Sequence, residues 1–371
     1  MSQDSSQSPP AQLTPGQITP AQSKWLKHFL VNELQLSDWQ MQPPIADASF
    51  RAYSRITHDQ GSYMLMHFPP SQENGDIIIS SSKFLISNNI RVPQLLGYDL
   101  DVGVVLQEDM GTELLSDYNQ SDSGNNDEIV EPLRQQLYQK SLGQLNLLQG
   151  LDASDFGYLD SDKLLGEMRL FGEWFIGKWL GTPPSVNLDE LEHLYLCLVE
   201  QILLAPQCCI HLDFHSRNIC VLESGGGKDI GLLDYQDLLQ GHFCYDIWSL
   251  LKDAYVRLPQ GMSDKLFKEF SATATQKFAV TDDYVRLHYN IIGVQRCLKV
   301  CGIFSRLFLR DGKEHYLPHI PLVMEHLNVA ITSLLEDDLA SKDLTNGLRG
   351  LGELLPQLRK LVEAKLLQGV E

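Results

Sequence analysis

The sequence predicts an α+β fold in two lobes, and three observations lead to that prediction. The chain has 371 residues, which is enough for two lobes with separate hydrophobic cores. β-prone runs joined by turn signals lie within residues 46–68 and again within residues 211–246. Apolar residues at helical spacing occupy residues 129–205 and most of residues 262–371. We therefore expect a strand-rich part and a larger, mainly α-helical part.

The composition disfavours two classes of partner. The net charge of −19 argues against binding to the phosphate backbone of nucleic acid and against binding to anionic membranes. No apolar run reaches the length of a membrane span, and the N-terminus lacks the basic region and apolar stretch of a secretory signal. The seven cysteines lie mostly within apolar segments, as expected of reduced core thiols. We expect a cytoplasmic protein with no nucleic-acid or membrane partner, and the oligomeric state stays open.

The first hundred residues are predicted to contain a tail, two helices and a hairpin. Residues 1–20 are rich in Ser, Gln and Pro and are expected to be a disordered tail. Residues 21–35 place apolar side chains on one helical face. Residues 46–68 indicate a strand hairpin, and residues 76–88 indicate the second helix.

Helices are expected to dominate the middle of the chain. Residues 89–97 lead back to a strand within residues 102–114, and the polar, acidic residues 116–128 are predicted to be a mobile loop. Three helices follow, at residues 129–149, 160–181 and 188–205. In the second of them the expected core residues are Leu165, Met168, Phe171, Trp174 and Phe175. Glu167 and Glu173 of this helix either point into a cleft or are solvated.

A second hairpin carries the residues with the clearest chemistry. Its strands are Ile219–Leu222 and Ile230–Leu233, separated by a glycine-rich link. A turn centred near Gly226 would pair Asn218 directly with Asp234, and Asp213 lies close enough in sequence to loop back to them. Two carboxylates and an amide oxygen are hard ligands, which suit a magnesium ion carrying substrate phosphates.

The C-terminal part is predicted to be helical from residue 262 onward. A helix begins just before it, near residue 245, and Asp246 lies at its start, where negative charge is favourable. Residues 284–317 are unusually rich in arginine and aromatic side chains for this acidic chain. They form either an amphipathic helix with solvated charges or a face that binds sugar and phosphate.

The spacing of His211, Asp213 and Asn218, followed by a strand-borne aspartate, resembles the catalytic and metal-binding loops of the kinase fold. The sequence Asp-Tyr-Gln-Asp at residues 234–237 resembles the aminoglycoside phosphotransferase branch. The resemblance implies a bilobal, protein-kinase-like fold that uses ATP and Mg²⁺. It implies that Asp213 is the base, that Asn218 and Asp234 bind magnesium, and that His211 and Asp246 support the loop. The implied lobes are an N-lobe at residues 21–109, which binds the nucleotide, and a catalytic and substrate-binding C-lobe at residues 110–371.

The same resemblance makes the first hairpin the part that covers the nucleotide. Its loop has no glycine, so Ser49 and Phe50 would approach the phosphates, and Met66 stands where the family usually has lysine. The helix at residues 76–88 contains no glutamate to pair with such a lysine. Candidates to hold the phosphates are Arg51 and Arg55, which are otherwise solvated strand residues. The hinge that would bind adenine comprises Gln107, Glu108, Asp109 and Met110.

Four stretches narrow the resemblance to the bacterial amino-sugar kinases that phosphorylate N-acetylmuramate and N-acetylglucosamine. They are DASFRAYSR with SYMLMHFPP, MRLFGEWFIGKWLG, LLDYQDLLQGHFCYDIWSLLKDAY and GVQRCLKVCGIFSRLFLRDGKEHYL. This resemblance implies phosphate transfer to the anomeric hydroxyl in peptidoglycan recycling. Its candidate sugar contacts are Glu173, Gln236, Asp237, Arg296 and Arg306. Two alternatives stay open: a kinase for aminoglycosides or other small alcohols, and a non-catalytic pseudokinase, which Met66 motivates.

Overall fold

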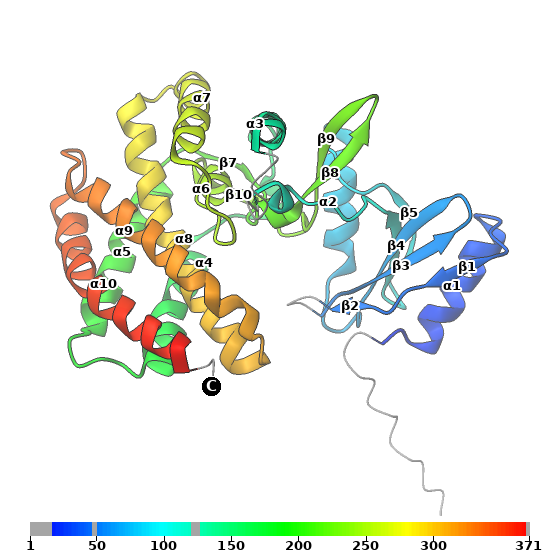
Figure 1. The fold of residues 1–371 in the computed structure, drawn as a ribbon, viewed down its shortest axis with the longest axis horizontal. Coiled ribbons are helices and arrows are strands. Elements are labelled where there is room, and N and C mark those ends of the chain that lie inside the picture. Colours follow the sequence, from blue (N-terminus) through cyan, green and yellow to red (C-terminus); the bar gives the residue numbers. More distant parts are fainter. Residues whose placement is uncertain (1–16, 47–49, 120–126, 369–371) are drawn as a thin grey trace, which may run out of the picture. The chain divides into compact units, whose positions relative to one another are not determined.

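The computed structural model describes residues 17–46, 50–119 and 127–368, and it divides the chain into two compact units (Figure 1). The N-terminal unit comprises Met1–Ile86 with Val92–Met110, and the C-terminal unit comprises Ser87–Arg91 with Gly111–Glu371. Most of the predicted tail, residues 1–16, lies outside the described residues, as do residues 120–126 of the predicted acidic loop. The expected α+β fold class, with a β-sheet unit and a mostly helical unit, is confirmed.

A single antiparallel sheet forms the centre of the N-terminal unit. Its strand order is β1-β3-β4-β6-β5, and the short β2 pairs with β3. The strands are β1 (Trp39–Met41), β2 (Ile45–Ala46), β3 (Ala52–His58), β4 (Gly61–His67), β5 (Leu95–Asp99) and β6 (Val104–Glu108). The predicted hairpin of residues 46–68 is present as β3 and β4.

Each face of this sheet is covered by one helix. Helix α1 (Pro20–Asn32) packs Leu26 and Leu30 against a cluster that includes Leu65. Helix α2 (Gly75–Ser87) packs its isoleucines against a second cluster that includes Met66. Since successive side chains of a strand point to opposite faces, the neighbours Leu65 and Met66 bury themselves under different helices.

Strand β5 lies largely in the segment 89–97, for which the sequence analysis predicted no strand. Its short run LLGYD is interrupted by Gly97, and the pairing with β6 is irregular between Leu95 and Gly97. A Cβ atom at Gly97 would lie 2.3 Å from the ring of Phe29 on α1. The glycine that weakens the strand signal is therefore the residue that lets α1 approach the sheet.

The C-terminal unit is built mainly of helices, with the long helix α8 buried along most of its length. Its helices are α3 (Asp127–Leu148), α4 (Ser161–Leu170), the π-helix η3 (Phe171–Leu180), α5 (Leu188–Leu204), α6 (Tyr245–Leu251), α7 (Gln260–Phe278), α8 (Asp282–Asp311), α9 (Ile320–Leu335) and α10 (Lys342–Gln368). Four short 3₁₀ segments join them: η1 (Leu115–Asn119), η2 (Ser154–Phe156), η4 (Ser216–Asn218) and η5 (Glu314–His319). No helix among the described residues is long and apolar enough to cross a membrane.

The predicted helix at residues 160–181 differs from the structure in two respects. It is α-helical only to Leu170 and continues as a π-helix. Two of the predicted core residues, Leu165 and Trp174, are only half-buried. The buried face runs through Leu164, Met168, Phe171 and Phe175, whose spacing of four, three and four residues follows one side of a helix. The residues Leu165 and Trp174 lie to the side of that face.

The described residues of the C-terminal unit include two small sheets. Strand β7 (Gln207–Ile210) pairs with β10 (Leu239–His242), a pair that the sequence analysis did not predict. Strand β8 (Ile219–Ser224) pairs with β9 (Gly227–Leu232), the predicted hairpin. The candidate catalytic residues follow β7 and β9, so both sheets anchor the chain next to them.

The register of the second hairpin differs from the prediction. Gly225 and Gly226 both have positive φ values, 54° and 95°, and together they form the two-residue turn that suits the twist of a hairpin. Ile219 consequently pairs with Leu232, and Asn218 lies opposite Leu233. The predicted direct pairing of Asn218 with Asp234 is therefore wrong, because the turn uses both glycines rather than centring on one.

Candidate active site

The loop that begins after β7 starts with a strained residue. Leu212 has a φ of 77°, in the left-handed region that costs a side-chain-bearing residue about 1–2 kcal/mol. The carboxylate of Asp246 accepts the backbone N–H of His211 at 2.6 Å and that of Leu212 at 3.2 Å. The guanidinium of Arg296 donates to the carbonyl of Leu212 at 3.0 Å. The strained turn is thus fixed through both its N–H and its carbonyl.

Asp246 is fully buried in the first turn of α6, where the sequence predicts it. Burial raises its pKa to about 7, although the hydrogen bonds from the loop and the charge of Arg296 oppose that shift. The raised pKa shows that burying a carboxylate here is unfavourable. The buried carboxylate nevertheless fixes the position of the start of the loop.

A second buried carboxylate, which the sequence analysis missed, fixes the other half of the loop. Asp253 is 1% exposed, and its Oδ2 accepts from both the backbone N–H (2.8 Å) and the hydroxyl (2.6 Å) of Ser216. Its Oδ1 accepts the backbone N–H of Tyr255 at 2.7 Å. Asp246 lies in the first turn of α6 and Asp253 two residues beyond its end at Leu251, so the segment around this one helix holds both halves of the loop.

Asp213 lies between these two supports and is half-buried. Burial alone would raise its pKa, but the positive charges of Lys299 and Arg296 on α8 hold the pKa below its ordinary value. Asp213 is therefore an ionised carboxylate at neutral pH, the state that a proton acceptor needs.

The charges that act on Asp213 belong to a buried network on α8. The ammonium of Lys299 contacts Glu167 at 2.7 Å and the hydroxyl of Tyr245 at 2.9 Å. Gln295 donates to the other oxygen of Glu167 at 2.7 Å, and the guanidinium of Arg296 lies 4.4 Å from the centre of the Tyr245 ring. Glu167 thus belongs to an internal network rather than to the solvent. The sequence offers one signal for it: polar residues at 295, 296 and 299 share a helix face.

Asn218 and Asp234 lie at the open end of the β8–β9 hairpin. The amide nitrogen of Asn218 donates to the carbonyl of Asp213 at 3.0 Å and contacts a ring nitrogen of His215 at 3.4 Å. Its amide oxygen remains as the acceptor of this side chain. Asp234 follows Leu233 with a φ of 57°, and its Oδ1 accepts from Gln236 at 2.9 Å.

The oxygen atoms of Asn218 and Asp234 fit the ligand preference of magnesium, a hard ion usually held by one or two carboxylates together with phosphates and water. Within the described part of the chain, no group of three or more His, Cys, Asp or Glu side chains is arranged to hold a metal ion. Asn218 and Asp234 supply only one amide and one carboxylate, which is fewer ligands than such a group contains.

His211 and Asp237 also belong to this region. His211 is buried, and burial lowers the pKa of its ring to about 4 even though the charge of Asp213 opposes the shift. A neutral imidazole packed edge-on against Phe214, at 5.8 Å between ring centres, is a structural support. Asp237 is exposed, and one of its oxygens accepts from Gln236 at 3.0 Å.

The structure groups most of the predicted C-lobe residues in this loop region, but two of them lie elsewhere. Glu173 is an exposed residue of η3, and its carboxylate pairs with Lys178 at 2.7 Å. Arg306 is half-buried on α8, and burial together with the charge of Arg310 lowers its pKa. Arg296 is in the loop region, but its contact with the Leu212 carbonyl makes it a support of the loop.

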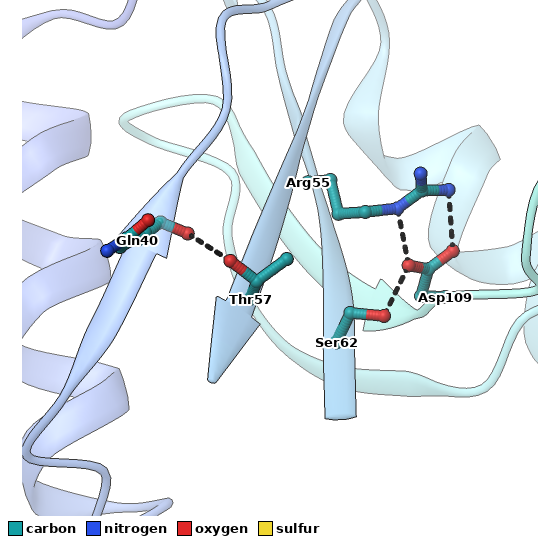
Figure 2. Close-up of polar contacts among 5 residues, drawn as sticks. All are labelled: Gln40, Arg55, Thr57, Ser62 and Asp109. Carbon is teal, nitrogen blue, oxygen red and sulfur yellow. Dashed lines mark hydrogen bonds and ion pairs between the residues drawn. The ribbon is translucent and has the colours of Figure 1, made fainter. Parts of the chain in front are cut away.

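In the N-terminal unit, Asp109 has a fully engaged side chain (Figure 2). Arg55 donates to its carboxylate from Nε at 2.6 Å and from Nη2 at 3.1 Å, and the hydroxyl of Ser62 donates at 2.6 Å. The three residues come from β3, β4 and the end of β6. The sequence analysis offered Arg55 either as a contact for the phosphates or as a solvated strand residue. In the structure its guanidinium is instead paired with Asp109.

The remaining nucleotide candidates differ in exposure. Phe50 is 63% exposed, whereas Arg51 is buried, with its Nε 3.6 Å from Glu73. Gln107 and Met110 are buried. Glu108 on β6 accepts the backbone N–H of Gln94 at 3.2 Å, and Ser49 lies outside the described residues.

Met66 packs within an apolar cluster at the position where the kinase resemblance expects lysine. It is 2% exposed, and the cluster includes Ile78 and Ile79 of α2. An apolar contact between β4 and α2 thus stands where an ion pair between a lysine and a glutamate would otherwise join strand and helix.

Comparison with known proteins finds a matching family model and similar proteins named as kinases. The model of the phosphotransferase enzyme family matches residues 40–279. A protein of Pseudomonas aeruginosa named N-acetylmuramate/N-acetylglucosamine kinase is 31% identical over 352 residues, which cover 92% of this chain and 96% of the relative. A protein of Neisseria meningitidis serogroup B with the same name is 31% identical, covering 81% of this chain and 89% of the relative.

Solved structures share the fold at low sequence identity. The ethanolamine kinase of Plasmodium vivax superposes with a TM-score of 0.55 at 12% identity, covering 83% of this chain and 88% of that one. A microcompartment-associated aminopropanol kinase gives a TM-score of 0.55 at 15% identity, covering 85% of this chain and 99% of that one. At these identities the likeness concerns the fold alone.

Proposed function

The chain belongs to the phosphotransferase enzyme family and is a kinase with an alcohol group as acceptor, and we propose that it phosphorylates the anomeric hydroxyl of N-acetylmuramate or N-acetylglucosamine with ATP. The observation that carries this proposal is the match to kinases named for these two sugars, at 31% identity over nearly the whole chain. The rigidly held, ionised Asp213 supplies the group that such a reaction needs.

Asp213 is proposed as the general base. The acceptor oxygen bonds to the γ-phosphorus, the bond from that phosphorus to the bridging oxygen of ATP breaks, and ADP leaves. The hydroxyl proton passes to Asp213. An anomeric hydroxyl is more acidic than an ordinary alcohol, so a carboxylate suffices as the acceptor of its proton. Most of the catalysis then lies in positioning, which the supports from Asp246 and Asp253 provide.

Asn218 and Asp234 are proposed to hold magnesium through their side-chain oxygens. The ion, when bound, neutralises charge on the phosphates of the nucleotide. Asp234 also receives a hydrogen bond from Gln236, which orients the carboxylate. Gln236 and Asp237 are proposed sugar contacts because they follow Asp234 directly. Glu173 and Arg306 remain weaker candidates for that role.

The nucleotide is proposed to bind the N-lobe, residues 21–109, while residues 110–371 form the catalytic lobe. Phe50 and Arg51 are the proposed phosphate contacts, together with Ser49. The segment Gln107–Met110 would offer backbone groups to adenine, because the carboxylate of Asp109 is already engaged by Arg55. The apolar cluster around Met66 stands where the kinase resemblance expects an ion pair, and it leaves no unpaired charge there.

We also propose that the enzyme acts in the cytoplasm, in peptidoglycan recycling. ATP is available there, and the seven cysteines are free, as expected in a reducing compartment. The place in peptidoglycan recycling rests on the proposed sugar substrate.

The test is a substrate panel with ATP and magnesium that contains N-acetylmuramate, N-acetylglucosamine, their methyl glycosides and kanamycin. ADP formation with the free sugars is expected, and the methyl glycosides are expected to fail because the nucleophilic oxygen is blocked. Phosphorus NMR should show a sugar 1-phosphate coupled to the anomeric proton. Phosphate on the primary hydroxyl, or efficient turnover of a methyl glycoside, would refute anomeric transfer. Turnover of kanamycin alone would favour the aminoglycoside alternative, and no turnover at all would favour the pseudokinase.

A further inference from the structure

An arginine of the catalytic loop carries no part of the function proposed so far. Arg217 lies in the 3₁₀ segment η4, between Asp213 and Asn218. It is half-buried, and its guanidinium carbon lies 3.8 Å from the centre of the Tyr255 ring. Its Nη2 lies 3.4 Å from Nε2 of His319, which must be the acceptor since arginine only donates.

Arg217 forms no direct ion pair within the described residues, although the carboxylate of Asp253 acts on the same two rings, Tyr255 and His319. The contacts of Arg217 among these residues are with the Tyr255 ring and with His319, and neither supplies a negative charge. Burial and the nearby Arg217 charge lower the pKa of His319, which keeps that ring neutral. A partly buried guanidinium that makes no direct ion pair keeps N–H groups that can donate to a bound anion. The expected partner is therefore an anion that comes with the ligand.

The position of Arg217 is fixed before any ligand binds. Tyr255, on which it stacks, is held through its backbone N–H by Asp253, the same carboxylate that holds Ser216 next to Arg217. Aromatic residues from α8 and η5 surround Tyr255: Phe304 at 5.8 Å and His319 at 5.0 Å between ring centres. These belong to the Arg- and aromatic-rich segment and its continuation, which thus meets the catalytic loop at Tyr255. A preorganised guanidinium loses little entropy on binding a carboxylate.

We infer that Arg217, stacked on Tyr255, binds the carboxylate of the acceptor and so favours N-acetylmuramate over N-acetylglucosamine. The inference rests on the proposed function. The two sugars differ by a lactyl ether that carries a carboxylate, so a cation on the loop that carries Asp213 distinguishes them by charge. The alternative source of an anion at this place is the transferred phosphate of ATP, which is common to both reactions.

The experiment compares kcat/KM for the two sugars in wild type, Arg217→Met and Arg217→Lys. The ratio of N-acetylmuramate to N-acetylglucosamine should fall about 10- to 100-fold in Arg217→Met, the effect of losing a charged hydrogen bond. It should fall less in Arg217→Lys, which keeps the charge but not the planar fork. Tyr255→Leu should lower the same ratio, because it removes the ring that orients Arg217. The control is Arg257→Met, which removes an exposed arginine paired with Glu325, and it should leave the ratio as in wild type.

The remaining outcomes would each contradict the proposed contact between Arg217 and the carboxylate of the sugar. An equal fall for both sugars, or a rise in the KM for ATP at a constant sugar ratio, would assign Arg217 to the phosphate and overturn the inference. A constant ratio in all variants would also overturn it. Wild-type turnover of N-acetylglucosamine without N-acetylmuramate would leave the proposed function standing and overturn the carboxylate contact. Failure of both sugars with the wild type would overturn the proposed function itself, and the inference with it.

Discussion

The interiors of the two units differ in whether a buried position carries a charge. In the N-terminal unit, Met66 stands at the position expected for a charged residue, 2% exposed and packed with Ile78 and Ile79. In the C-terminal unit, Lys299 is similarly buried, at 7% exposed, but its ammonium contacts Glu167 and Tyr245. One interior position is apolar and needs no partner, and the other is charged and has two polar partners.

The difference shows what a buried charge needs in order to persist. Removing an ammonium and a carboxylate from water costs several kcal/mol each, and an apolar replacement of both is often neutral or stabilising. The N-terminal unit takes the apolar solution at Met66, although it buries Arg51 beside Glu73 elsewhere. In the C-terminal unit, the buried cations Lys299 and Arg296 are those that keep Asp213 ionised. Of these two interior positions, the charged one is therefore the one that acts on Asp213, the proposed base.

The largest expected effect concerns the group on which those charges act. Asp213→Asn should lower kcat by about 10² to 10⁴-fold, the usual contribution of a general base. The binding of ATP should persist, because the base does not hold the nucleotide. The measurements are steady-state kinetics with the sugar and calorimetric titration with ATP and magnesium.

A matched control is Asp229→Asn, which removes a carboxylate from the β8–β9 hairpin that pairs with Lys140. This variant should turn over like the wild type. Wild-type turnover in Asp213→Asn would remove Asp213 from the role of base and would leave the buried charges of α8 without the purpose given to them here.

Breaking the charged interior should cost stability. Lys299→Met leaves the partly buried Glu167 without its cation, and the free energy of unfolding should fall by about 3–5 kcal/mol. The double variant Lys299→Met with Glu167→Gln should recover part of that loss, because no lone charge remains. Denaturant unfolding of the three proteins measures this. A single variant as stable as the wild type would mean that the pair is not desolvated in solution.

The reverse experiment places a charge in the apolar interior. Met66→Lys should lower the free energy of unfolding by about 2–4 kcal/mol, because the cluster around it is apolar and Asp76 of α2 is exposed, although the long lysine chain can bend toward water. Met66→Leu is the control and should cost less than about 1.5 kcal/mol. If Met66→Lys were as stable as Met66→Leu, the cluster would not be a sealed apolar contact.

Acid should act on the interior of the C-terminal unit through its histidines. His211, His288 and His326 are buried there, and burial lowers the pKa of each to about 4. Between the unfolded value of about 6.5 and that value only the unfolded chain binds the proton, so stability falls as the pH falls. For His326 the loss should be about 2 kcal/mol at pH 5. Unfolding curves at pH 7.5 and pH 5 should therefore differ less for His326→Leu than for the wild type, and an equal difference would contradict the assignment.

The sequence predicts this fold and site unevenly, and the reasons are local. The hairpin and the place of Asp246 follow from residues within one short stretch, whereas the register depended on whether the turn uses one glycine or two. Asp253 was missed because its contact with Ser216 joins positions 37 residues apart and leaves no pattern in either segment. Lys299 was missed for a similar reason: its partner Glu167 lies on a different helix. Such contacts become visible only when the helices are packed.

The smallest expected effect tests whether the strain at Leu212 is real. Its φ of 77° is one that glycine adopts freely, and the bonds from Asp246 and Arg296 hold it there. Leu212→Gly should therefore raise the free energy of unfolding by roughly 0.5–1 kcal/mol, the relief of the strain less the greater freedom of glycine in the unfolded chain.

The same substitution at Leu196, a half-exposed residue in the interior of α5, provides the control, since glycine in an ordinary helix costs about 1 kcal/mol relative to alanine. The two leucine-to-glycine changes should thus differ in sign, and chemical denaturation of both variants measures the difference. Two losses of equal size would mean that Leu212 is not strained in solution. Opposite signs would instead show that the loop that carries Asp213 contains backbone strain at Leu212, in addition to the buried cations packed near it.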